Sequence, residues 1–218
     1  MTGWYGYFFA FFMFFLSHSI PVRPAVKARL VSRLGQRGFT IAYSALSTAM
    51  LVWVIVAAGR APFIGLWDWA LWQNHVTLTC MFLACVIAAM AIGRPNPLSF
   101  GGAHNDRFEP SAPGLVGWVR HPLLAALLLW ALGHMVPNGN LAHLILFGLF
   151  AGFSLLGAKI VNRRQKRIMG EARWHALTQT RRELRLTTNG VLRFGIGVAV
   201  YLTLIGLHGP VIGVSPLF

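Results

Sequence analysis

Apolar residues dominate six long stretches of the chain, and short polar segments separate them. The stretches cover residues 3–20, 38–58, 74–92, 122–137, 141–161 and 191–208. Most approach the length of about 20 residues that a helix needs to cross the hydrocarbon core of a bilayer. The sequence therefore predicts an all-α fold: a polytopic membrane helical bundle of about six transmembrane helices, built as a single integral membrane domain over residues 1–218.

Basic residues gather in alternate connections between these stretches. The second connection has only Arg60, and none follows the fourth or the sixth stretch. Apart from Arg193 in the sixth stretch, the first, third and fifth connections hold the others: Arg23, Lys27, Arg29, Arg33, Arg37; Arg94, Arg107, Arg120; and Lys159, Arg163, Arg164, Lys166, Arg167, Arg173, Arg181, Arg182, Arg185. Since Lys and Arg mark cytoplasmic loops, we expect both termini to be periplasmic. Residues 159–190 then form a basic cytoplasmic loop before a last helix at 191–208.

Composition points to lipid as the main partner. The chain is 56% hydrophobic and only 11% charged, whereas soluble domains have about a quarter charged residues. Its formal net charge of +14 comes from residues that flank apolar runs, which suits an anionic membrane surface and argues against nucleic acid. Cys80 and Cys85 share one apolar run and are interpreted as small apolar residues.

Histidines at the ends of the predicted helices are the candidate functional residues. His18 and His121 lie at cytoplasmic ends, and His75 and His134 lie at outer ends. Ionisable residues inside a bilayer are costly, so function is the first hypothesis and interhelical hydrogen bonding is the alternative. Acidic ligands are scarce, and imidazoles in a helix bundle suit a transition metal or haem iron. We therefore take all four histidines as candidate metal ligands.

The depth of each histidine in the membrane limits which of them can bind the same iron. His121 and His134 are separated by thirteen residues of one helix, or about 20 Å, so they cannot bind the same metal. Depth alone pairs His18 with His121 and His75 with His134. The four histidines could form two metal sites, or one metal site and one pair that only stabilises the structure, and both possibilities remain open.

The tripeptide Arg120-His121-Pro122 opens the fourth helix. Proline is favourable there, and the positive end of the helix dipole favours a neutral His121. Arg120 would then hold an anionic group of a cofactor, such as a haem propionate. The alternative is an interfacial cap in which Arg120 only obeys the positive-inside rule.

Several motifs, in order, resemble the NnrU family of membrane proteins over about residues 1–161. They are Ser17-His18-Ser19, Arg23-Pro24, residues 27–38, Tyr43-Ser44, Leu66-Trp67-Asp68, Val119-Arg120-His121-Pro122-Leu123, Trp130-Ala131-Leu132-Gly133-His134 and Asn138-Gly139-Asn140. The resemblance implies a bacterial inner-membrane protein linked to nitrite and nitric oxide metabolism. It also implies nitrogen-oxide reductase components as partners.

Two related families supply alternative functions. The plant and cyanobacterial 15-cis-zeta-carotene isomerase, a haem b enzyme, implies His18 and His134 as haem ligands and cis–trans isomerisation of a carotenoid-like polyene. Its proposed alternate cysteine ligand is Ala131 here, so a ligand switch through it is absent. Isoprenylcysteine-type membrane methyltransferases share the Arg-His-Pro motif and imply S-adenosylmethionine. However, residues 162–167 are basic and lack the acids of those enzymes. Whether the protein is an enzyme, and in which oligomeric state, is left open.

Overall fold

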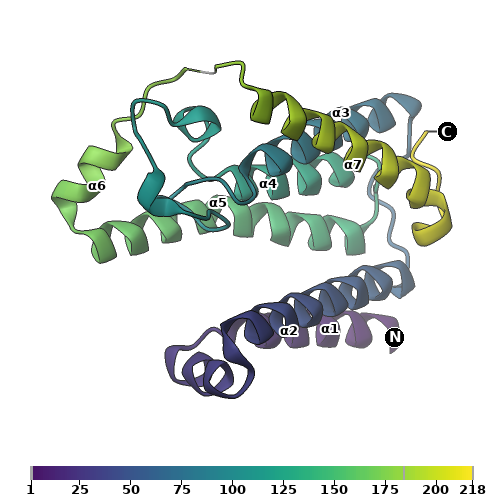
Figure 1. Ribbon diagram of the computed structural model, residues 1–218. Helices are drawn as coiled ribbons and strands as arrows, with labels where there is room; N and C mark the ends of the chain where they lie inside the picture. Colours follow the sequence, from purple (N-terminus) through teal and green to yellow (C-terminus); the bar gives the residue numbers. More distant parts are fainter. Residues whose placement is uncertain (1, 184, 218) are drawn as a thin grey trace. The chain divides into compact units, whose positions relative to one another are not determined.

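The computed structural model describes residues 2–183 and 185–217, and these residues are mostly helical (Figure 1). The elements are α1 (Thr2–Ser19), α2 (Pro24–Arg60), α3 (Leu71–Ala91), η1 (Asn105–Arg107), η2 (Gly114–Gly117), α4 (Pro122–Met135), α5 (Leu141–Met169), α6 (Glu171–Thr178) and α7 (Thr188–Ile212).

Each of the six apolar stretches coincides with a helix, which confirms the all-α membrane fold. Among the residues that were placed, α2, α3, α5 and α7 are long and apolar enough to cross a membrane. Helix α4 is apolar but shorter, and α1 has 18 residues without Asp, Glu, Lys or Arg. The number of six spans and the periplasmic termini stay predictions.

The chain divides into two compact units. The first comprises the chain up to Trp67 together with Asn140–Leu146, and the second comprises Asp68–Gly139 with the chain from Phe147 onward. In the first unit α1 and α2 pack against each other. Gly3 of α1 lies so close to the end of α2 that an added Cβ would sit 2.9 Å from the Arg60 carbonyl oxygen. The helices therefore form an antiparallel hairpin.

Helix α2 contains a sharp break at Gly35. This glycine has φ 71° and ψ 166°, a conformation that a residue with a side chain rarely adopts. Before it, residues 24–34 form a separate helical segment that lies at an angle to the rest of α2 (Figure 1). The basic residues of the first predicted connection thus lie largely on a helix, because Pro24 starts it and Lys and Arg favour helix.

The second unit is built around α3, which packs against both α4 and α7. Two glycines allow these close approaches. A Cβ on Gly133 of α4 would lie 2.8 Å from Cys80 Cβ, and one on Gly197 of α7 would lie 2.8 Å from Val86 Cα. Small residues at helix crossings are typical of membrane bundles, where van der Waals packing replaces the hydrophobic effect.

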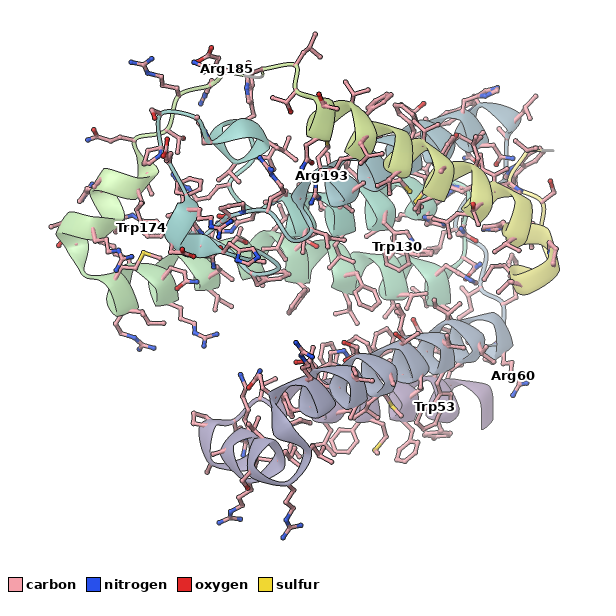
Figure 2. All side chains as sticks on the ribbon, in the orientation of Figure 1. Trp53, Arg60, Trp130, Trp174, Arg185 and Arg193 are labelled. Atoms are coloured by element: carbon pink, nitrogen blue, oxygen red, sulfur yellow. The ribbon has the colours of Figure 1, made fainter. Side chains whose placement is uncertain are left out.

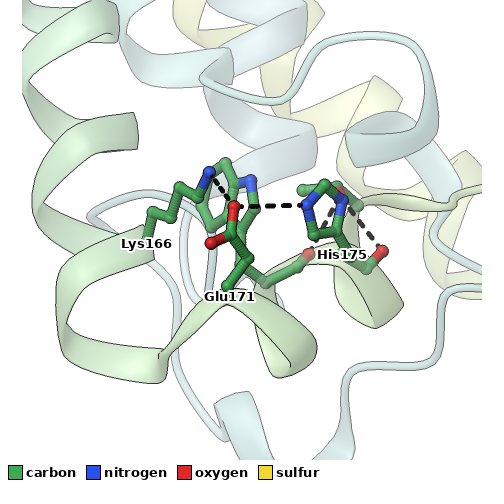
Figure 3. A network of polar contacts seen from close by, with 5 residues as sticks. Lys166, Glu171 and His175 are labelled. Carbon is green, nitrogen blue, oxygen red and sulfur yellow. Dashed lines mark hydrogen bonds and ion pairs between the residues drawn. The ribbon is translucent and has the colours of Figure 1, made fainter.

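The connections rich in arginine fold over one end of this unit, which we call the basic end. The indole of Trp174 on α6 packs in a buried cluster with Leu98, Phe108 and Val116. Helix α5 continues to Met169, so the basic segment after residue 159 is helical for ten residues. Glu171 at the start of α6 pairs with Lys166 of α5 and lies 3.7 Å from His175 Nε2 (Figure 3). These contacts stabilise the turn between α5 and α6.

Candidate functional site

His121 occupies the N-cap position of α4 at the basic end, and both of its ring nitrogens are hydrogen-bonded. Its Nδ1 lies 3.0 Å from Ser99 Oγ, and its Nε2 lies 3.0 Å from Asn162 Oδ1 on α5. An amide oxygen only accepts, so Nε2 carries the proton and Nδ1 accepts from the Ser99 hydroxyl. His121 is 9% exposed. The imidazole thus joins three segments of the second unit and has no ring nitrogen left for a metal.

The charge state of His121 follows from its surroundings. Burial lowers the pKa of His121 below its usual value, the hydrogen bond to Asn162 acts against this, and the nearby Arg120 charge lowers it further. The side chain is therefore neutral at neutral pH, as expected from its place at the start of α4.

Arg120 faces α6. Its guanidinium carbon lies 5.5 Å from the centre of the Trp174 ring, and its carbonyl oxygen accepts from Asn96 Nδ2 at 3.0 Å. A guanidinium over an indole face is a stabilising cation–π contact. Figure 2 marks Trp174 at the α6 side of the second unit. Arg120 thus holds α6 against the loop before α4, a role that the sequence motif did not indicate.

His134 lies in the last turn of α4, at the other end from His121. Its Nδ1 lies 2.8 Å from the Trp130 carbonyl oxygen, four residues earlier. Aromatic rings surround it, with ring centres 5.5 Å away at Trp130 and 5.3 Å away at Phe147. Figure 2 labels Trp130 within this helical bundle. The imidazole is therefore held in one orientation by a hydrogen bond and by packing.

His208 of α7 is the residue that the sequence did not single out. Its ring centre lies 6.4 Å from that of His134, with the ring planes 24° from parallel, and its Nδ1 lies 2.6 Å from the Val214 carbonyl oxygen. The only sequence signal was that both residues end apolar helices on the same predicted side. His75, which depth had paired with His134, is exposed on α3.

His18 of α1, in the first unit, has the same local arrangement as His134. Its Nδ1 lies 2.8 Å from the carbonyl oxygen of Phe14, four residues earlier, and its ring stacks on Phe14 at 4.0 Å. Tyr43 of α2 packs edge-on at 6.1 Å and donates its hydroxyl to the His18 carbonyl oxygen at 3.3 Å. The hairpin of α1 and α2 thus fixes this imidazole.

The donor chemistry at His18 and His134 fits haem iron. A carbonyl oxygen only accepts, so in both residues Nδ1 carries the proton and the lone pair is on Nε2, the usual state of an iron-ligating histidine. Across residues 2–183 and 185–217, no hydrogen bond reaches either Nε2 atom, and no group of three or more His, Cys, Asp or Glu side chains gathers for a metal ion. An imidazole in this state suits the coordination of haem iron.

The family comparison then decides what kind of protein this is. The model of the NnrU protein family matches residues 7–216, nearly the whole chain. The chain belongs to the NnrU family. The match runs well beyond residue 161, the limit of the resemblance seen in the sequence, and includes the basic segment and α7 of this NnrU-family protein. No curated protein and no solved structure gives a significant match.

Proposed function

We propose that this NnrU-family protein binds haem b in the bacterial inner membrane, that His18 and His134 are each suited to ligate haem iron, and that the protein acts in the metabolism of nitrogen oxides. The observation that carries the proposal is the shared arrangement of the two imidazoles. Each is tied through Nδ1 to the carbonyl oxygen four residues before it, and each keeps Nε2 for a ligand. The proposal does not include His121 as a ligand, because Ser99 and Asn162 are hydrogen-bonded to its nitrogens.

The protein's contribution is to orient the two imidazoles and to surround them with apolar rings. Phe14 and Tyr43 do this at His18, while Trp130 and Phe147 do it at His134. Hydrogen bonds from Nδ1 to carbonyl oxygens raise the basicity of the ligating nitrogens, and apolar surroundings lower the local dielectric constant. Haem held by these residues would supply one-electron chemistry and the binding of a diatomic gas such as nitric oxide.

Absorbance spectra of the detergent-purified protein from a haem-sufficient host test the proposal. The wild type is expected to show a Soret band, with sharp bands after reduction and a shift of the Soret band when nitric oxide is added. His18→Gly and His134→Gly should each lose most of the bound haem or change its spin state. Added imidazole should restore the spectrum, since it replaces the missing ligand.

Two histidine variants sharpen the test. His175→Gly changes an exposed histidine and should leave the spectrum as in the wild type. His208→Gly removes the ring next to His134 and should also retain haem, since His208 is not assigned as a ligand. Loss of haem in His208→Gly together with full retention in His18→Gly would contradict the assignment of His18 and His134 as ligands. A colourless wild type without iron would contradict the proposal as a whole.

A further inference from the structure

The basic end of the second unit contains a cavity that the histidines do not line. Its volume is about 370 Å³. The loop after α3, around Arg94 and Arg107, forms one wall, and the segment leading into α7, around Arg185 and Arg193, forms another. Figure 2 labels Arg185 and Arg193 beside the start of α7. No candidate ligand of the proposed haem contributes to it.

Positive charge exceeds negative charge in this cavity. Four arginines line it, with two glutamates, Glu109 and Glu183, which leaves two positive charges in excess. Arg185 is paired with Glu183 through two contacts of 2.9 and 3.2 Å. Arg193 donates to neutral acceptors, the carbonyl oxygens of Ala89 and Ile92 at 2.9 and 2.7 Å, and so keeps its charge. An unpaired guanidinium near a low-dielectric bilayer favours an anionic ligand.

Arg94 and Arg107 are the cavity arginines available for such a ligand. Both are exposed, and in the placed parts of the chain neither side chain makes an ion pair or a hydrogen bond. Each guanidinium presents a planar fork of donors that matches the oxygens of a phosphate group. Their side chains can therefore turn to a ligand without breaking a contact of the fold.

The loop that carries Arg94 is held in place by its own hydrogen bonds, without a ligand. Asn96 is 3% exposed, its backbone N–H donates to Asn105 Oδ1 at 2.9 Å, and its Oδ1 accepts from Leu98 N at 3.1 Å. The Arg94 carbonyl oxygen accepts from Ala103 N at 3.2 Å. At Gly102 an added Cβ would lie 2.7 Å from Asn105 Oδ1 and 2.9 Å from Asn96 N, so only glycine fits there. Preorganisation of this kind lowers the cost of binding.

Apolar surface adjoins the cavity. It lies where the apolar helix α3 ends and the apolar helix α7 begins, and Met90, Ala91 and Val116 contribute to its walls. Ile92, Val191 and Leu192 beside it are 58%, 60% and 65% exposed. A charged site bordered by lipid-facing residues matches a ligand with a charged head and apolar chains.

We propose that this cavity binds the phosphate group of an anionic phospholipid headgroup through Arg94 and Arg107. The same chemistry would hold a free phosphate ion. The location at the ends of two apolar helices favours the lipid, because its acyl chains would lie along exposed residues of α3 and α7. The site is independent of the proposed haem function.

Binding of short-chain lipids to the delipidated protein in detergent tests the proposal, with dihexanoyl phosphatidylglycerol, dihexanoyl phosphatidylcholine and inorganic phosphate as separate ligands. Phosphatidylglycerol is expected to bind saturably to the wild type, and at least about tenfold more weakly to the double variant R94Q/R107Q, since two charge-assisted contacts are lost. R94K/R107K keeps the positive charges but lacks the planar fork of donors. Its affinity for phosphatidylglycerol should therefore lie between those of the wild type and R94Q/R107Q. R163Q/R164Q, which changes two basic residues of α5 outside the cavity, should bind as the wild type does.

The three ligands separate the two sources of phosphate. Phosphatidylglycerol binding that depends on Arg94 and Arg107 and exceeds that of phosphatidylcholine and inorganic phosphate supports a lipid site. Inorganic phosphate binding with equal strength and equal arginine dependence would overturn the lipid as the ligand. Equal phosphatidylglycerol affinity in the wild type and R94Q/R107Q would overturn the site itself.

Discussion

The hydroxyl of Thr77 on α3 donates to the carbonyl oxygen of Gly133 on α4 at 2.8 Å. Gly133 immediately precedes His134, and an added Cβ there would lie 2.8 Å from Cys80 Cβ. The hydrogen bond and the missing side chain together allow α3 and α4 to approach closely at this level. The position of the candidate ligand His134 therefore depends on the crossing of two helices.

Gly133→Ala is expected to destabilise the protein by about 1–3 kcal/mol, because the new methyl group meets the Cys80 side chain and forces the helices apart. Thermal unfolding of the purified protein in detergent measures the effect. Gly152→Ala is the matched control, since nothing lies within 4 Å of a Cβ added at Gly152. Equal thermal unfolding midpoints for Gly133→Ala and Gly152→Ala would show that α3 and α4 are not closely packed at Gly133.

The Tyr7 hydroxyl joins α1 to the first turn of α5 within the first unit. Tyr7 is 0% exposed and donates to the Ala142 carbonyl oxygen at 2.6 Å. Tyr7→Phe should therefore lower the free energy of unfolding by about 1 kcal/mol, the usual net worth of one hydrogen bond. Tyr5→Phe removes a hydroxyl from a residue that is 75% exposed and should leave the thermal midpoint unchanged. A Tyr7→Phe midpoint equal to that of the wild type would contradict this role.

The His121 network predicts a pH dependence of stability. The pKa of His121 is lower in the folded protein than in the unfolded chain, so the unfolded chain binds more protons as the pH falls below about 6.5. The contribution of His121 is then complete above this pH and is lost as the pH falls from 6.5 toward the folded value. Thermal midpoints of the wild type between pH 8 and pH 5 should fall more steeply than those of His121→Gln, which cannot titrate. Parallel curves for the two proteins would contradict the prediction.

A second variant tests the hydrogen bond partner of His121. Asn162→Ala leaves the buried Nε2–H without its acceptor and should cost about 1–3 kcal/mol of stability at pH 8. Asn189→Ala changes an exposed amide on α7 that pairs with Arg193 and should cost far less. In both variants, haem binding at His18 and His134 should persist if the fold is retained.

The six helices and the NnrU family were predictable because each rests on short-range information. An apolar run of the right length forms a helix in a bilayer wherever it lies, and the motifs around His18 and His134 are contiguous residues. Pro122 correctly marks the start of α4. The pattern of apolar stretches does not predict the helical segment 24–34, because this segment is rich in charged residues, although Lys and Arg are good helix formers.

The site was predictable only in part. His18 and His134 were singled out by sequence, but the hydrogen bonds that orient their rings follow from helix geometry and the rotamer of each side chain. Depth along one helix correctly separated His121 from His134, yet it paired His134 with His75, whereas the structure places the ring of His208 at 6.4 Å. Depth gives the height of a residue in the membrane and says nothing about the side of the helix on which it lies.

The sequence by itself therefore determined the membrane class, the positions of the apolar helices and the family, since these depend on runs of neighbouring residues. Only the tertiary structure decided that the nitrogens of His121 are occupied by Ser99 and Asn162, and that Arg94 and Arg193 line one cavity. The physical reason is that hydrogen bonds and charge clusters act over a few ångströms. Residues separated by 22 to 99 positions come within that distance only when α3, α4, α5 and α7 have packed.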